Sequence, residues 1–222
     1  MNCYTMSKQI MIIGLGQFGM SLARTLAERG AEVLAVDISQ EKVDAVAEFV
    51  SRAVAIDATD ENALAGLRPA ERDAVVCSIG DSSKEAAIIC TALLRQMGCP
   101  CIIARAWNPT YRRILFMVGA HEVISPEHDY GRHFATWLMH KELLARIDWN
   151  GELSLSEIKP PQFMIGKSLI ELALPKEYGI IVAAVRRNGK LSRPNPEIPI
   201  EAEDALLIVS NEDAIARLSE VK

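Results

Sequence analysis

Short apolar runs alternate with amphipathic stretches through the first two-thirds of the chain. The apolar runs predict six strands, at 9–13, 32–36, 53–56, 74–79, 101–104 and 121–124. Runs such as AVVCSI (74–79) are continuous rather than alternating, which is typical of parallel strands buried on both faces. Since the stretches between them predict helices, we expect an α/β fold with a doubly wound parallel sheet and right-handed crossovers.

Polar residues mark the starts of two of these helices. Ser39 and Asp60 each stand immediately before a helical pattern, where such a side chain can cap the first turn. A longer pattern, from Pro126 to Ile147, follows the last strand and predicts one continuous helix. Its apolar stripe is broad enough to cover either the sheet of its own domain or, as we prefer, a partner subunit. The stripe contains Tyr130, Phe134, Trp137, Leu138, Leu144 and Ile147.

The character of the chain changes near residue 150. The segments LSLSEI, GIIVAAVRR and ALLIVS follow as strand-like runs, and Asn188-Gly189 between two such runs predicts a hairpin. We therefore predict a large α/β domain over residues 1–125, a crossover helix and linker over 126–150, and a small α+β domain over 151–222.

Composition narrows the function classes. The 222 residues carry a formal net charge of −5, which argues against nucleic acid as a partner. No apolar run is long enough for direct membrane insertion. The five cysteines have no zinc-ligand spacing, so we expect reduced, mostly buried thiols in a cytoplasmic protein.

A glycine motif follows the first predicted strand directly. Gly14, Gly16 and Gly19 form G-x-G-x-x-G at the start of a helix: the first allows a tight turn, the second close approach of a phosphate, and the third helix packing. Asp37 ends the second strand, where a carboxylate accepts hydrogen bonds from both ribose hydroxyls and disfavours a 2′-phosphate. Because helix N-termini favour anions, this context predicts a Rossmann-like nucleotide-binding domain.

The ends of the other strands should complete the pocket, because ligands bind beyond the carboxyl ends of parallel strands. The candidates are Asp57-Ala58-Thr59, Ser78-Ile79-Gly80 and Arg105. Asp57 and Thr59 either contact an adenine edge or cap the next helix, and the sequence favours neither. For Arg105 we favour a phosphate partner over a solvated salt bridge.

The sequence disfavours an enzyme. A dehydrogenase needs an acid placed against its substrate carbonyl, usually His, Lys or Tyr. All four histidines fall within residues 121–140, and no histidine or cysteine lies in 151–222. An NAD-dependent oxidoreductase with a Rossmann domain stays as the alternative to a binding protein.

Several segments together resemble a known family. IIGLGQFGMSLARTLAERGAEVLAVD, AIDAT, VVCSIGDS, IIARAWN and GAHEVISPEHDYG, in this order, resemble the RCK (regulator of K+ conductance) proteins, in particular KtrA/TrkA-like cytosolic subunits of bacterial potassium uptake systems. GKSLIELALPKEYGIIVAAVRRNG and EAEDALLIV resemble the C-terminal RCK domain. The likeness thus extends over almost the whole chain.

The resemblance implies a regulatory, gating subunit without chemistry of its own. Its expected partners are a membrane-embedded potassium pore subunit (KtrB/TrkH-like) and further copies of itself, in a ring of two to eight subunits. The expected location is cytoplasmic, peripheral to the inner face of the plasma membrane. A free-standing ligand-sensing domain for another transporter is a further alternative.

The resemblance also implies ligands and their contacts. ATP/ADP or NAD(H) would bind the glycine pocket beside Gln17 and Phe18, with Asp37 at the ribose and Arg105 near the phosphates. Glu127 matches a glutamate near the phosphates at a subunit contact, where Mg²⁺ or Ca²⁺ can bind; its carboxylate also suits the first turn of a helix. Gln17 departs from the arginine frequent in the family, which leaves ADP or NAD open.

Overall fold

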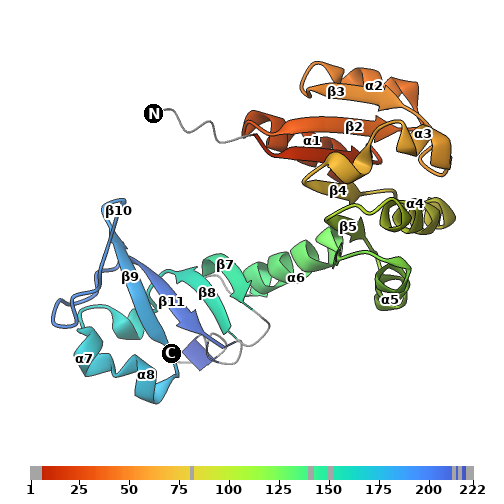
Figure 1. Ribbon diagram of the computed structural model, residues 1–222. Coiled ribbons are helices and arrows are strands. Elements are labelled where there is room, and N and C mark those ends of the chain that lie inside the picture. The colour runs from red at the N-terminus through yellow and green to blue at the C-terminus, as the bar shows by residue number, and fades with distance from the viewer. Residues whose placement is uncertain are drawn as a thin grey trace, which may run out of the picture. The chain divides into compact units, whose positions relative to one another are not determined.

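The computed structural model describes residues 7–80, 83–139, 143–149 and 153–211, together with 214, 217 and 218. The chain divides into two compact units between His128 and Asp129 (Figure 1). Each unit has its own hydrophobic core: two clusters of buried residues lie in the first unit and one lies in the second.

The first unit contains a six-stranded parallel sheet in the order β3-β2-β1-β4-β5-β6. Its strands are β1 (Gln9–Ile13), β2 (Glu32–Asp37), β3 (Arg52–Ala55), β4 (Ala74–Cys77), β5 (Ile102–Arg105) and β6 (Glu122–Ile124). This is the strand order of a dinucleotide-binding doubly wound sheet, whose direction of winding changes between β1 and β4. The predicted α/β fold is confirmed.

Helices pack on both faces of this sheet. On one face, α1 and α2 pack around Ile12, and on the other α3, α4 and α5 pack around Met11 and Ile13. Burial on both faces explains why the strands are continuously apolar. The helices are α1 (Gln17–Glu28), α2 (Gln40–Ala47), α3 (Glu61–Ala65), α4 (Lys84–Gln96) and α5 (Pro109–Val118), with a 3₁₀ turn, η1, at Pro69–Glu71.

One of the two predicted helix caps is present. Asp60 Oδ1 accepts hydrogen bonds from the backbone N–H groups of Asn62 (2.9 Å) and Ala63 (3.1 Å), which caps α3. The prediction for Ser39 is wrong, because its side chain makes no capping bond. Its backbone N–H donates instead to Asp37 Oδ1 at 2.9 Å, so an aspartate two residues earlier organises the start of α2.

The predicted helix from 126 to 147 is too long. Helix α6 spans Pro126–Met139, and Leu143–Trp149 forms strand β7, which pairs antiparallel with β8 (Leu153–Ile158). Apolar residues in 143–149 fit a period of two as well as a helical one, and pairing with β8 satisfies backbone groups along the whole strand. The side chain of Trp137 and all of His140 lie outside the described residues.

The second unit is a small α+β fold, as predicted. Its antiparallel sheet has the order β10-β9-β11-β8-β7, with β9 (Ile181–Arg187), β10 (Lys190–Ser192) and β11 (Ala205–Ser210). Short helices precede β9: η3 (Gln162–Met164), α7 (Leu169–Leu172) and α8 (Leu174–Glu177). The predicted hairpin joins β9 to β10 through Asn188 (φ 51°) and Gly189 (φ 77°), the left-handed pair that a two-residue turn requires.

Two further expectations concern the described residues alone. No helix among them has the length and apolarity needed to span a membrane. Within the same residues no three His, Cys, Asp or Glu side chains are grouped so as to bind a metal ion. Cys77, Cys90 and Cys99 are buried and Cys101 is half-buried, which agrees with the expected burial of these cysteines.

Candidate functional site

A cavity of about 270 Å³ lies at the carboxyl edge of the parallel sheet. Its wall comes from the segments that follow β1, β2, β3 and β4 and from the first turns of α2 and α4. The cavity therefore occupies the crevice where the winding of the sheet changes direction. The lining residues are Ile13, Gly14, Gly16, Asp37, Ile38, Lys42, Ile56, Asp57, Ala58, Thr59, Ser78, Ile79, Gly80, Ser83 and Ala86.

The three motif glycines differ in whether the structure leaves room for a side chain at their position. Gly14 has φ +96°, and a Cβ there would lie 2.8 Å from the backbone nitrogen of Ile79. A Cβ on Gly19 would overlap the carbonyl oxygen of Gly14. Gly16 has an ordinary φ of −70°, and its Cβ would have no neighbour within 4 Å. The fold thus requires the first and third glycines, whereas the second leaves open space beside the backbone at the start of α1.

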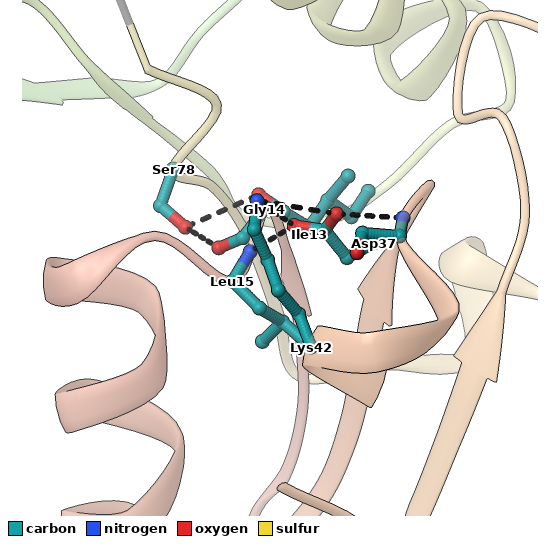
Figure 2. A network of polar contacts seen from close by, with 7 residues as sticks. Ile13, Gly14, Leu15, Asp37, Lys42 and Ser78 are labelled. Atoms are coloured by element: carbon teal, nitrogen blue, oxygen red, sulfur yellow. Dashed lines mark hydrogen bonds and ion pairs between the residues drawn. The ribbon is translucent and has the colours of Figure 1, made fainter. Parts of the chain in front are cut away.

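Ser78 fixes the glycine turn from the side of β4. The residue is 1% exposed, and its hydroxyl lies 2.6 Å from the carbonyl oxygen of Gly14 and 3.1 Å from that of Ile13 (Figure 2). Its backbone N–H also donates to the Ile13 carbonyl at 2.8 Å. These bonds join the ends of β1 and β4, so the two sides of the crevice form one rigid edge.

Asp37 fixes the same turn from the side of β2. Its carboxylate is 6% exposed and accepts hydrogen bonds from the backbone N–H of Leu15 (2.6 Å) and of Ser39 (2.9 Å). The ammonium group of Lys42, half exposed, lies 3.4 Å from Oδ2 (Figure 2). Asp37 therefore has a structural role as well as a place in the cavity wall, and the carboxylate is held in one orientation before any ligand arrives.

The next strand end supplies a second acidic group. Asp57 Oδ1 accepts hydrogen bonds from the Thr59 hydroxyl (2.7 Å) and from the Thr59 backbone N–H (2.9 Å). The hydroxyl bond first, and the N–H bond second, lower the pKa of Asp57, so it remains a carboxylate. Asp60, rather than Asp57, caps the following helix. The bonds of Asp57 to Thr59 instead stabilise the turn that forms part of the cavity wall.

Arg105 is not a lining residue and has a carboxylate partner. Its guanidinium makes two hydrogen bonds to Glu127, of which the Nε–Oε2 bond is 3.3 Å, and lies 5.9 Å from the ring centroid of Phe18. The salt bridge, the less favoured of the two predicted partners, is therefore the one in the structure. Glu127, the expected cation ligand, is therefore bound to Arg105 in this structure, and its role at a Mg²⁺ or Ca²⁺ site stays a prediction.

The structure brings most of the predicted residues into one wall. Those outside it are Gln17, Phe18, Gly19, Arg105 and Glu127. Sequence reasoning missed Ile13, Ile38, Lys42, Ile56, Ser83 and Ala86 as lining residues. Ile38 was detectable in principle from the sequence, because an apolar residue directly follows the acidic strand end; in the structure it is 71% exposed.

Comparisons with known proteins place this architecture in a family. The TrkA-N domain model matches residues 10–126 and the TrkA-C domain model matches residues 153–222. The chain is 35% identical to Ktr system potassium uptake protein A of Bacillus subtilis (strain 168), over 95% of both chains. It is 31% identical to the protein of the same name from Vibrio alginolyticus, over 96% of both.

Solved structures share the fold. A GsuK channel bound to NAD matches with a TM-score of 0.65 and 22% identity, over 97% of this chain and 39% of that one. A GsuK structure bound to ADP matches with a TM-score of 0.52 and 22% identity, over 62% and 36%. The present chain thus spans less than half the length of these solved chains.

Proposed function

The chain belongs to the TrkA-N and TrkA-C domain family of potassium uptake proteins, and we propose that it is the nucleotide-binding regulatory subunit of a potassium channel or transporter. The observation that carries this proposal is the cavity in which the glycine turn and the ends of four parallel strands meet. Near full-length likeness to proteins named for potassium uptake supports the same role.

An adenine nucleotide matches the chemistry of the cavity. Ile38, Ile56 and Ile79 offer apolar surface for a base, and the fixed Asp37 carboxylate offers acceptors for ribose hydroxyls. The open space beside Gly16 admits a phosphate to the N-terminus of α1. ADP, ATP and NAD(H) share these parts, and the GsuK structures, named as bound to NAD or ADP, support the same ligand class.

The ligand acts as an allosteric effector in this proposal. A nucleotide shifts the equilibrium between two shapes only by its difference in affinity for them. A tenfold difference is worth about 1.4 kcal/mol per site, and sites in a ring of identical subunits add. The proposed assembly is such a ring, located in the cytoplasm against a KtrB/TrkH-like pore subunit.

The proposal includes no catalytic step. None of the described residues lining the cavity is a histidine, tyrosine or cysteine, and Lys42, the lining cation, is paired with Asp37. Turnover of NADH with a carbonyl substrate by the purified protein would instead identify an oxidoreductase.

Gly16→Ala tests the proposed site. A Cβ at residue 16 meets no protein atom within 4 Å, so the variant should fold with an unchanged melting temperature. The same methyl group fills the space that the phosphate needs, so calorimetry should show ADP and NAD binding weakened by at least about tenfold, roughly 1.4 kcal/mol.

Gly66→Ala is the matched control. It adds the same methyl group in the first unit, away from the cavity wall, with its nearest neighbour, the Ala63 carbonyl oxygen, at 3.4 Å. Unchanged nucleotide affinity in Gly16→Ala, or no binding by the wild-type protein, would contradict the proposed site. Identification of the co-purifying nucleotide by mass spectrometry would name the ligand.

A further inference from the structure

Resting on this proposed function, we propose that Tyr111 is a positioning residue for nucleotide binding. Its hydroxyl donates a hydrogen bond to the backbone carbonyl oxygen of Lys84 at 2.9 Å, which joins the first turn of α5 to the first turn of α4. Ser83 and Ala86, at the start of α4, line the cavity, whereas Tyr111 does not. Tyr111 therefore acts on the ligand through α4 rather than by direct contact.

The start of α4 depends on support from outside the helix. Ser83 stands at its N-cap, but the Ser83 side chain makes no capping hydrogen bond. In α3 and α5, by contrast, the side chains of Asp60 and Asn108 accept hydrogen bonds from backbone N–H groups of the first turn. Helix ends fray, and a side-chain cap is what usually stabilises the first turn. The position of the cavity wall at Ser83 and Ala86 is therefore set by tertiary contacts.

Tyr111 is itself held in place. The residue is 5% exposed, and its backbone N–H donates to Asn108 Oδ1 at 2.8 Å. Its ring stacks on that of Trp107, with the ring centroids 3.8 Å apart and the ring planes at 26°. Because a buried and stacked ring has little rotational freedom, the Tyr111 hydroxyl is a fixed point for the carbonyl group of Lys84.

Trp107 also contacts the side chain of Lys84. The ammonium group lies 5.0 Å from the centroid of a Trp107 ring, within the range of a cation–π interaction. Lys84 is thus held at two points, at its backbone by Tyr111 and at its side chain by Trp107. Trp107 is the second residue after β5, and α4 and α5 pack against each other (Figure 1). Both points therefore connect the start of α4 to the carboxyl edge of the sheet.

A wall that is in place before the ligand arrives improves affinity, because the ligand does not have to order it. Tyr111→Phe removes the hydroxyl and keeps the buried ring with its stacking on Trp107. The Lys84 carbonyl keeps the i+4 hydrogen bond of the helix, so the variant should fold. The first turn of α4 should then open more often, and a nucleotide must order it on binding.

Calorimetry with adenosine and with ADP tests the effect on affinity. In Tyr111→Phe we expect both compounds to bind about three- to tenfold more weakly, because one neutral hydrogen bond is lost and both compounds use the same wall. Tyr178→Phe is the matched control: it makes the same chemical change in the second unit, and both affinities should be unchanged. Melting temperatures establish that each variant is folded.

Hydrogen exchange, read by mass spectrometry, distinguishes positioning from a general loss of stability. The backbone N–H groups of residues 88–90 bond to carbonyl groups in the first turn of α4, so their exchange reports its opening. In ligand-free Tyr111→Phe these groups should exchange faster than in the wild type, and saturating ADP should restore their protection. Exchange in residues 9–37, on the other side of the cavity, should stay unchanged.

Unchanged affinities in Tyr111→Phe, or faster exchange throughout the first unit, would overturn the positioning role while leaving the nucleotide site in place. Weaker binding of ADP alone would also overturn it, because a contact with the phosphates would then be responsible. Failure of the wild-type protein to bind either compound would overturn the proposed function itself.

Discussion

The two units differ in where the ends of their strands lie, and therefore in where the polar residues at those ends are placed. In the parallel sheet every strand ends at the same edge, so the residues after β1, β2, β3 and β4 converge on one cavity. In the antiparallel sheet neighbouring strands end at opposite edges, and the arginines of β9 pair with carboxylates from other segments of the same unit. Strand direction thus explains why the ends of four strands of the first unit meet around one cavity.

In the second unit, Arg187 at the end of β9 pairs with Asp204, the residue before β11. Asp204, with a side chain 1% exposed, accepts bonds from Arg187 Nε (2.7 Å) and Nη2 (2.6 Å) and from the backbone N–H of Glu201 (2.8 Å). Arg187 also contacts the Glu201 carboxylate at 2.8 Å. These charges bind one another, and Arg187 and Asp204 also line a cavity of about 190 Å³, whereas Asp37 faces the cavity at the ends of the parallel strands.

Gly19→Ala should have the largest effect and should act on the first unit alone. Its Cβ overlaps the Gly14 carbonyl oxygen and lies 2.6 Å from the Ser78 hydroxyl, so the joint between β1, α1 and β4 must move. We expect a loss of about 3 kcal/mol or more, at the upper end for overpacked cores. Hydrogen exchange read by mass spectrometry should show faster exchange in 7–80 and unchanged exchange in 153–211. Equal loss of protection in both would contradict independent units.

Asp204→Asn should have an intermediate effect confined to the second unit. It weakens a buried, bidentate charge pair, which we expect to cost about 2 kcal/mol near neutral pH. The bonds from Arg187 first, and the Glu201 N–H, lower the pKa of Asp204 in the folded state. This stabilisation is therefore complete above the unfolded pKa of about 3.9 and is lost as pH falls toward the lower folded value.

Urea unfolding at a series of pH values measures both parts of that prediction. The wild-type second unit should lose stability as pH falls below about 4, and Asp204→Asn should show a shallower fall. Identical pH profiles for the two proteins would exclude Asp204 as the source.

Lys42→Met should have the smallest effect on stability. Lys42 is half exposed, and Asp37 keeps its bonds from Leu15 and Ser39 when the ammonium group is removed. We expect a change within about 1 kcal/mol, as for other exposed ion pairs, measured by urea unfolding. A loss as large as that of Asp204→Asn would show that the cation, rather than the two backbone N–H groups, holds Asp37 in place.

Local patterns in the sequence were sufficient for the parallel sheet. Continuous apolar runs predicted all six strands because burial on both faces leaves no polar alternation. The glycine spacing predicted the turn after β1, and the structure shows why at Gly14 and Gly19, where a Cβ does not fit. Asp60 was predictable as a cap because that bond lies within four residues of chain.

Sequence patterns that are compatible with two different local structures were not sufficient to predict which one forms. Residues 143–149 fit both a helix and a strand, and antiparallel pairing with β8, which begins at Leu153, decided for β7. Ser39 had the residue type of a cap, but its side chain makes no capping bond, and its backbone N–H donates to the buried Asp37 carboxylate. Strand β7 was decided by pairing with another segment, which the pattern of 143–149 alone does not contain.

The amino-acid order by itself therefore determined the α/β fold, the glycine turn and the identity of most residues around the cavity, because each depends on neighbours along the chain. Only the tertiary structure decided that Asp37 supports the turn through Leu15, that Lys42 and Ile38 join the wall, and that Arg105 pairs with Glu127. Those facts depend on distances between residues far apart in sequence, which are set when the sheet orders its strands and brings their ends to one edge.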